Sequence, residues 1–166
     1  MRLFLLRHAQ AHETFPDFER KLTPFGEYQI RLLCDLIDSG CFCNLAQVWH
    51  SPYERAKRTA EIFCSEMNIS APLQQVSNIT PEDNPRDVAR TIASISSFGG
   101  DLLIVSHNPF LEALANTLIN SQTGGLVFKK CTLAALSNLS SPDSIRPYGL
   151  WSTDFLISPS FLSRSQ

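Results

Sequence analysis

Residues 1–10 read M-R-L-F-L-L-R-H-A-Q, and their apolar run from Leu3 to Leu6 stops abruptly at Arg7 and His8. A short run that is apolar at every position is typical of a strand buried on both faces of a sheet. The two residues that follow such a strand lie at its carboxyl end. The function therefore depends on which other side chains reach the same end of the sheet.

Two later segments have the same design. Residues 102–105 form a second unbroken apolar run, followed by Ser106, His107, Asn108 and a proline. Residues 47–50 read as another strand, which leads into a serine and a proline. Ligands of open α/β sheets bind outside the carboxyl ends of the strands. We therefore expect the polar residues after these strands to gather in one place.

Four helices are predicted from one repeated start signal, a capping residue followed by proline. The cap's side chain accepts a hydrogen bond from a free backbone N–H, and proline at the first helical position loses no intrahelical bond. The four pairs are Thr23-Pro24, Ser51-Pro52, Asn84-Pro85 and Asn108-Pro109. Ser51 and Glu54 also fit a capping box. Apolar positions at helical spacing follow each start, for example Val88, Ile92 and Ile95 in the third helix.

Strands and helices alternate along most of the chain, which predicts an α/β fold. Two final strand-like runs, 132–139 and 150–157, are separated by the turn-rich residues 140–144 and read as an antiparallel pair. We expect a three-layer α/β/α sandwich whose mixed sheet is mostly parallel with an antiparallel edge. Residues 1–158 form one domain in this prediction, and residues 159–166 form a frayed tail.

Composition excludes several function classes. The chain has 166 residues, of which 43% are hydrophobic and 18% charged, with a net charge of −2. This balance is typical of a globular domain and gives no overall basic field for nucleic acid or an acidic membrane. No apolar stretch is long enough for a membrane span or a signal peptide, so we expect a cytoplasmic protein. Its five cysteines, odd in number, are predicted to be reduced.

The polar residues expected at the sheet edge suit phosphate. Arginine's planar fork binds phosphate oxygens in pairs and stays charged, and helix N-termini add N–H groups. Neutral histidine can act as a nucleophile, and a second histidine can stabilise charge on a transferring phosphoryl group. Arg7 or His8 alone would more often be a surface residue at a strand end. The segments around Arg55 and His107 make a phosphate site the better interpretation.

Three blocks resemble the histidine phosphatase superfamily. Residues 6–9 (L-R-H-A) resemble its R-H-G signature, residues 51–60 (S-P-Y-E-R-A-K-R-T-A) its second block, and residues 106–109 (S-H-N-P) the block with its second histidine. The chain length and residues 22–26 (L-T-P-F-G) are most similar to the compact SixA-type phosphohistidine phosphatases. The resemblance implies a phosphoglycerate mutase-like fold and runs from the start of the chain to about the final strand.

The resemblance also implies catalytic roles. His8 would attack phosphorus and become a phosphohistidine, and Arg7 and Arg55 would bind the phosphoryl oxygens. His107 would complete the phosphate site and stabilise negative charge in the transition state. No metal and no cofactor are implied, because arginines and a histidine supply the positive charge that Mg²⁺ supplies elsewhere.

Two features depart from the family pattern. Ala9 replaces the signature glycine, and alanine is less comfortable with a positive φ. Larger family members also carry a carboxylic general acid, for which Glu82 and Asp83 are the candidates here. The competing interpretation is that both acids complement the dipole at a helix N-terminus. An imidazole leaves phosphorus with little help, since its conjugate acid has a pKa near ~6.5. A site without a strong acid therefore favours phosphohistidine over alkyl phosphates.

The sequence thus predicts a phosphatase acting on a phosphohistidine of a protein, such as the phosphotransfer domain of a two-component relay. One alternative is a small-molecule phosphomonoesterase that uses the same site, and turnover on the two kinds of substrate separates them. The other is a non-catalytic phosphate-binding domain, which has no need of an uncharged nucleophile such as His8. The sequence leaves the oligomeric state open.

Overall fold

A computed structural model of the chain describes residues 1–94, 99–121, 125–140 and 146–161. Within these residues, six strands form one sheet in the order β3-β2-β4-β1-β5-β6. The strands are β1 (Arg2–Arg7), β2 (Leu45–His50), β3 (Leu73–Gln75), β4 (Asp101–Ser106), β5 (Leu133–Asn138) and β6 (Trp151–Ile157). The first four strands of that order are parallel, and β5 and β6 pair antiparallel at the edge. The predicted mixed sheet with an antiparallel edge is confirmed.

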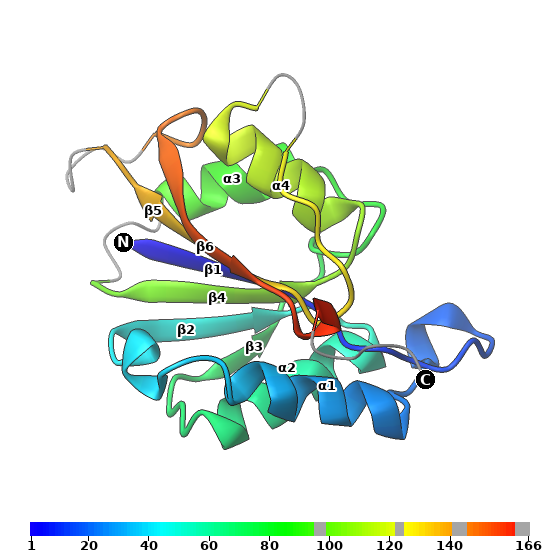
Figure 1. The fold of residues 1–166 in the computed structure, drawn as a ribbon. Coiled ribbons are helices and arrows are strands. Elements are labelled where there is room, and N and C mark those ends of the chain that lie inside the picture. The colour runs from blue at the N-terminus through cyan, green and yellow to red at the C-terminus, as the bar shows by residue number, and fades with distance from the viewer. Residues whose placement is uncertain (95–98, 122–124, 141–145, 162–166) are drawn as a thin grey trace.

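Two pairs of helices cover the sheet, one pair on each face (Figure 1). The α-helices of the described residues are α1 (Pro24–Cys34), α2 (Glu54–Glu66), α3 (Pro85–Ser94) and α4 (Phe110–Ile119). Short 3₁₀ helices lie at η1 (Asp17–Glu19), η2 (Ser39–Phe42) and η4 (Pro159–Phe161). α1 and α2 lie together below the sheet in this view, and α3 and α4 lie above it. The predicted three-layer sandwich is therefore confirmed.

Strand β1 divides its apolar side chains between two cores. Phe4 and Leu6 belong to the core under α1 and α2, whereas Leu3 and Leu5 belong to the core under α3 and α4. All four side chains are fully buried. Because side chains alternate across a strand, only a strand covered on both faces needs an apolar residue at every position. This explains the unbroken run at the start of the sequence.

Two of the four predicted helix starts are confirmed and two are wrong in detail. The Thr23 hydroxyl accepts from the Gly26 backbone N–H at 2.9 Å, and the Asn84 side chain accepts from the Arg86 N–H at 3.1 Å. By contrast, α2 begins at Glu54 after Tyr53, and the predicted Ser51 capping box is not formed. α4 begins at Phe110, and the Asn108 side chain does not cap it. Both side chains have tertiary partners instead, which are described with the site.

Some sequence predictions fall outside the described residues. Ile95 and most of the predicted turn at 140–144 lie there, as do residues 162–166 of the predicted tail. The part of that tail that is described, Pro159–Phe161, forms η4 beside α1. None of the helices in the described ranges is both long and apolar enough to cross a membrane.

Gly26 fixes the segment that leads from His8 to α1. The backbone of Thr23 donates to the carbonyl of Gln10 at 3.0 Å, and Gly26 lies against the same carbonyl. A Cβ at position 26 would collide with the Gln10 oxygen, which is backbone and cannot turn away. Glycine is therefore required here by close packing.

We predict that Gly26→Ala lowers the free energy of unfolding by about 1–3 kcal/mol, the usual cost of overpacking. Urea denaturation followed by circular dichroism measures the change. Gly40→Ala is the matched control, because the nearest atom there is the flexible carboxylate of Asp38, at 3.0 Å from the added Cβ. Equal midpoints for the two variants would contradict the packing argument.

Candidate functional site

The candidate site lies at the carboxyl ends of three neighbouring strands, with β4 between β1 and β2. His8 follows β1, His107 follows the central strand β4, and Ser51 follows β2. The sheet's hydrogen bonding continues into these residues: His8 N–H donates to the Ser106 carbonyl, and Ser51 N–H donates to the Val105 carbonyl, each at 3.0 Å. The sheet backbone therefore holds His8 and Ser51 beside the end of β4, which His107 follows.

The His8 ring is oriented by two contacts that distinguish its nitrogens. Nδ1 lies 2.7 Å from the carbonyl oxygen of Ala9, so Nδ1 must carry the proton and donate it. Nε2 then holds the lone pair, which accepts from Arg55 Nε–H at 3.3 Å. The tautomer is thus set by the backbone, with the proton on Nδ1 and the lone pair on Nε2.

Arg55 lies in the first turn of α2 and is tied to the His8 segment. The Thr59 hydroxyl donates to the Arg55 carbonyl at 2.7 Å and accepts from the Ala9 N–H at 3.2 Å. Ala9 is fully buried and is not among the residues with positive φ. Alanine therefore fits this signature position without backbone strain, and the departure from glycine has no conformational cost.

His107 is buried between two aromatic rings. Its centroid lies 4.9 Å from that of His8 and 4.9 Å from that of Tyr53. Nε2 of His107 lies 2.8 Å from the Ser51 hydroxyl, which is the tertiary partner that Ser51 has in place of a helix cap. Nδ1 is also buried and has no hydrogen-bond partner among the described residues. A buried polar atom without a partner is costly, so Nδ1 is suited to an oxygen of a ligand.

Arg7 is held by a network that reaches across the fold. Its Nη1 donates to the Phe128 carbonyl at 2.6 Å, and the Asn108 amide donates to the same oxygen at 2.9 Å. Glu112 accepts from the Asn108 amide at 2.7 Å and from the Phe128 N–H at 3.0 Å. Asn108 therefore joins α4 to the segment before β5 instead of capping the helix. The network leaves Nε of Arg7 buried and without a hydrogen-bond partner in the part of the chain that the structure describes.

Burial and repulsion keep both imidazoles neutral. Desolvation and then the charges of Arg55, Arg7 and Lys130 lower the pKa of His8 to about 3, although the bond to Ala9 opposes this shift. Desolvation and then His8, Arg55 and Arg7 lower the pKa of His107 to about 2. A bound anion would act in the opposite direction and raise both pKa values. The charges of the site therefore favour the binding of an anion.

The two candidate general acids lie on the rim. Asp83 accepts from the Thr80 N–H and the Thr80 hydroxyl, each at 2.7 Å, and so closes the turn before α3. Glu82 accepts from the Thr80 hydroxyl at 3.2 Å and from the Tyr53 hydroxyl at 3.4 Å. Glu82 thus contacts the site through Tyr53, whereas Asp83 is engaged in its own turn. Neither contact shows an acid directed at His8.

The structure brings Arg7, His8, Arg55 and His107 together, as the sequence motifs predict, and their catalytic roles stay predictions. Residues that sequence reasoning missed hold this set in place: Asp17, Ser51 in its tertiary role, Tyr53, Thr59, Glu112 and the carbonyl of Phe128. Ser51, Tyr53 and Thr59 at least lie within the second sequence block. Asp17 and Phe128 carry no sequence signal, because their contacts are with residues far away in the chain.

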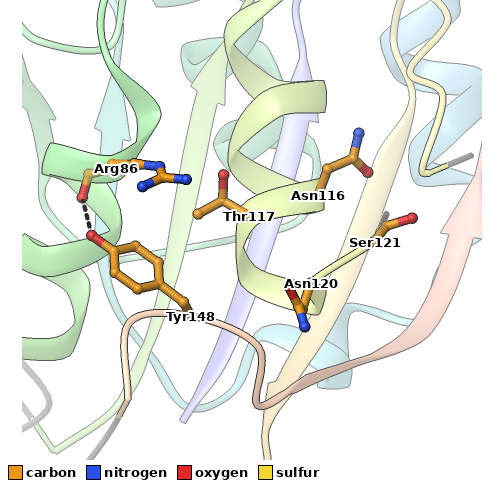
Figure 2. Close-up of a pocket in the computed structure, with 6 residues that line it drawn as sticks. All are labelled: Arg86, Asn116, Thr117, Asn120, Ser121 and Tyr148. Carbon is orange, nitrogen blue, oxygen red and sulfur yellow. Dashed lines mark hydrogen bonds between the residues drawn. The ribbon is translucent and has the colours of Figure 1, made fainter. Parts of the chain in front are cut away.

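A separate depression of about 300 Å³ lies between α3, α4 and the segment before β6 (Figure 2). It is lined by Arg86, Asn116, Thr117, Asn120, Ser121 and Tyr148. The Tyr148 hydroxyl donates to the Arg86 carbonyl at 3.4 Å, and the Thr117 hydroxyl donates to the Ala113 carbonyl at 2.7 Å. This depression adjoins the C-terminal half of α4, whereas His107 precedes the N-terminus of that helix. It is therefore not part of the histidine site.

Within the described residues, no group of three or more His, Cys, Asp or Glu side chains is placed to hold a metal ion. The five cysteines are free thiols; Cys64 and Cys131 are buried, and Cys43 is exposed. Burial raises the pKa of the Cys64 thiol to about 12.

Comparison with solved structures finds the same fold in several phosphatases. The protein histidine phosphatase SixA in complex with tungstate shares 23% identity and a TM-score of 0.84, covering 98% of this chain and 100% of its own. A putative phosphohistidine phosphatase SixA from Agrobacterium tumefaciens shares 20% identity and a TM-score of 0.75, covering 95% and 97%. A mycobacterial glucosyl-3-phosphoglycerate phosphatase shares 18% identity and a TM-score of 0.64, covering 92% and 96%. A comparison with curated proteins gives no match.

The fold and the site define a phosphoglycerate mutase-like α/β sandwich with paired histidines and arginines at the sheet edge. A family model of the histidine phosphatase superfamily (branch 1) matches residues 3–80. Over this stretch the chain is similar to the histidine phosphatase superfamily, and its fold matches that of the SixA structures. The matched stretch holds His8 and Arg55 but ends before His107, which joins the site through the fold.

The lowered pKa values predict a pH-dependent stability. Below pH ~6.5 the unfolded chain protonates His8 and His107 while the folded protein does not, so acid favours unfolding. We expect the free energy of unfolding to fall by about 1 kcal/mol for each ring between pH 7.5 and pH 5.5. Urea midpoints at the two pH values measure this loss.

The double variant His8→Asn/His107→Asn is the control for this prediction. It removes both buried rings, and we expect its stability to depend less steeply on pH than that of the wild type. An equal loss of stability in the variant and the wild type would show that other groups cause the effect.

Proposed function

We propose that the chain is a phosphatase that works through a covalent phosphohistidine on Nε2 of His8. We further propose that its substrate is a phosphohistidine on a protein, such as the phosphotransfer domain of a two-component relay. The observation that carries the proposal is the orientation of His8. Ala9 fixes the Nδ1 proton, and burial beside two arginines keeps Nε2 unprotonated. Nucleophilic catalysis needs this state.

The reaction has two displacements. The Nε2 lone pair of His8 attacks phosphorus, the bond between phosphorus and the substrate nitrogen breaks, and the imidazole leaves with a proton that solvent has already placed on that nitrogen. Water then attacks the phosphorus on His8, and the electron pair of the new P–N bond returns to Nε2. Inorganic phosphate leaves with the oxygen of that water, one proton of the water returns to solvent, and His8 is neutral again. Each step develops charge on the phosphoryl oxygens, which the guanidiniums of Arg7 and Arg55 would stabilise.

We propose that His107 binds a phosphoryl oxygen through its free Nδ1. Ser51 can supply its hydroxyl proton to Nε2 of His107, which leaves the ring's own proton on Nδ1. The ring is then a neutral donor in the empty site, and the negative phosphoryl group favours its protonated form. Serine in this block therefore positions the second histidine.

We propose that the reaction needs no metal ion. Two guanidinium groups already supply positive charge beside His8, and Arg55 comes from the first turn of α2, where the helix dipole adds to it. This arrangement is suited to the charge that phosphoryl transfer places on the oxygens.

The position of the acids supports a substrate with a good leaving group. The contacts around Nε2 of His8 come from arginine, and the carboxylates of Glu82 and Asp83 are engaged at the rim. An alkoxide would need a proton from an acid, whereas an imidazole can be protonated by solvent beforehand. Three structural neighbours are named SixA, one of them a protein histidine phosphatase bound to tungstate.

A small-molecule phosphomonoesterase is the second candidate function. It is favoured by the similarity to the mycobacterial glucosyl-3-phosphoglycerate phosphatase, which has also been solved with inorganic phosphate. That protein has a lower TM-score than the SixA structures, 0.64 against 0.84 and 0.75. A phosphate-binding domain without activity is less favoured, because the nucleophilic nitrogen of His8 is kept neutral and oriented.

Trapping of the phosphoenzyme tests the mechanism. We expect an acid-labile, alkali-stable phosphate on the wild type after rapid mixing with a phosphohistidine substrate, and none on His8→Ala. Phosphoprotein electrophoresis after acid and alkali treatment detects it. Full turnover by His8→Ala would reject the proposed nucleophile.

Substituting the rim acids tests the leaving-group argument. We expect Glu82→Gln and Asp83→Asn to leave turnover of a phosphohistidine protein nearly unchanged, because the imidazole leaves without their proton. Steady-state release of inorganic phosphate measures it. A loss of about a hundredfold, the size expected for a general acid, would contradict the argument.

The same assay compares substrates. A sugar phosphate and a nucleotide phosphate serve as the competing substrates for the wild type. High activity on either, with none on phosphohistidine, would reject the preferred substrate and support the phosphomonoesterase.

A further inference from the structure

Asp17 contacts the arginine beside the nucleophile and has no role in the reaction described so far. Arg55 Nη1 donates to the Asp17 backbone carbonyl at 2.6 Å, and Arg55 Nη2 donates to the Asp17 carboxylate at 2.9 Å. The Arg55 side chain is 6% exposed and the Asp17 side chain 51% exposed. A surface residue from η1 thus holds a buried guanidinium through two hydrogen bonds.

The two contacts use one end of the guanidinium and leave the other end toward His8. A guanidinium has five N–H groups, one on Nε and two on each Nη. Asp17 accepts from both Nη atoms, while Nε faces Nε2 of His8 at 3.3 Å. One N–H on each terminal nitrogen therefore remains for phosphoryl oxygens. Asp17 and a phosphoryl group at His8 do not need the same donors.

Asp17 is itself held in place. Arg20 Nη1 donates to the second carboxylate oxygen of Asp17 at 2.9 Å, and Arg20 Nε donates to the carbonyl of His12. Partial burial tends to raise the pKa of Asp17, but hydrogen bonds from Arg20 and Arg55 outweigh it and lower that pKa. The carboxylate is therefore an ionised bridge between two arginines. A bridge of this kind restricts the rotation of a long side chain.

The negative charge of Asp17 is unfavourable beside a phosphate site. A carboxylate near bound phosphate weakens binding through repulsion. Transition-state stabilisation depends on hydrogen-bond donors that are already in place. The contact between the Asp17 carboxylate and Arg55 is explained if the stabilisation gained by fixing the guanidinium exceeds that repulsion.

We propose that Asp17 is a positioning residue that fixes Arg55 for the phosphoryl-transfer transition state at His8. This inference rests on the proposed function. Asp17 acts through Arg55, and the segment that carries Asp17 becomes a structural part of the site. The alternative is that Asp17 competes with phosphate for Arg55, in which case its removal would improve anion binding.

Anion binding separates the two cases and needs no turnover. Isothermal titration calorimetry measures the affinity of the full chain for orthovanadate, which can adopt the five-coordinate geometry of the transition state, and for inorganic phosphate, which cannot. We expect Asp17→Ala to weaken vanadate binding by about tenfold, the loss of one charge-assisted hydrogen bond. Phosphate binding should change less, because the tetrahedral ion depends less on exact placement of Arg55.

Two further variants make the test sharp. Asp17→Asn keeps an acceptor oxygen for Arg55 without the charge, and we expect it to recover part of the vanadate affinity. Glu19→Ala is the matched control, because Glu19 lies on the same 3₁₀ helix, is exposed, and loses the same charge. We expect Glu19→Ala to bind vanadate as the wild type does or slightly more tightly.

The outcomes that overturn the inference are distinct from those that overturn the proposed function. Tighter phosphate binding by Asp17→Ala would show competition and reject positioning. Equal vanadate affinities of Asp17→Ala and Glu19→Ala would reject it as well. A wild type that binds neither anion would reject the proposed phosphate site together with the inference.

Discussion

Two guanidinium groups and two imidazole rings share a buried corner of this molecule, and desolvation is the constraint on which the arrangement depends. A protonated imidazole would be costly beside Arg7 and Arg55, so His8 and His107 stay neutral. In a neutral ring, a hydrogen-bond partner determines which nitrogen carries the proton. The Ala9 carbonyl does this for His8, and the Ser51 hydroxyl contacts His107. The positive charge of the two arginines disfavours a protonated imidazole and favours a bound anion. The protonation state of the free site is therefore linked to anion binding.

Much of this could be predicted from the sequence because it follows from local patterns. Apolar runs gave the buried strands, and the residues after β1 and β4 had to lie together because these strands are parallel neighbours. The departure at Ala9 proved harmless because the backbone there does not adopt positive φ. What local patterns cannot supply is the partner of a side chain across the fold.

The two wrong helix caps show this limit. Ser51 and Asn108 have the residue types and the following prolines that favour capping, yet their side chains bind His107 and the Phe128 carbonyl. A tertiary hydrogen bond in a buried site outweighs a local preference. Asp17 was missed for a related reason, since a single acid in a loop looks like any solvated charge. Its role becomes visible only when Arg55, 38 positions later, is placed beside it.

The bond between Arg7 and the Phe128 carbonyl joins residues that are 121 positions apart. A ribosome makes Arg7 early, but its partner exists only after most of the domain has been synthesised. Closing so long a loop is entropically costly, and such contacts form late in folding. The anion site therefore cannot exist in a partly made chain. A ligand that binds there stabilises only the completed fold, so binding is thermodynamically linked to the integrity of the whole domain.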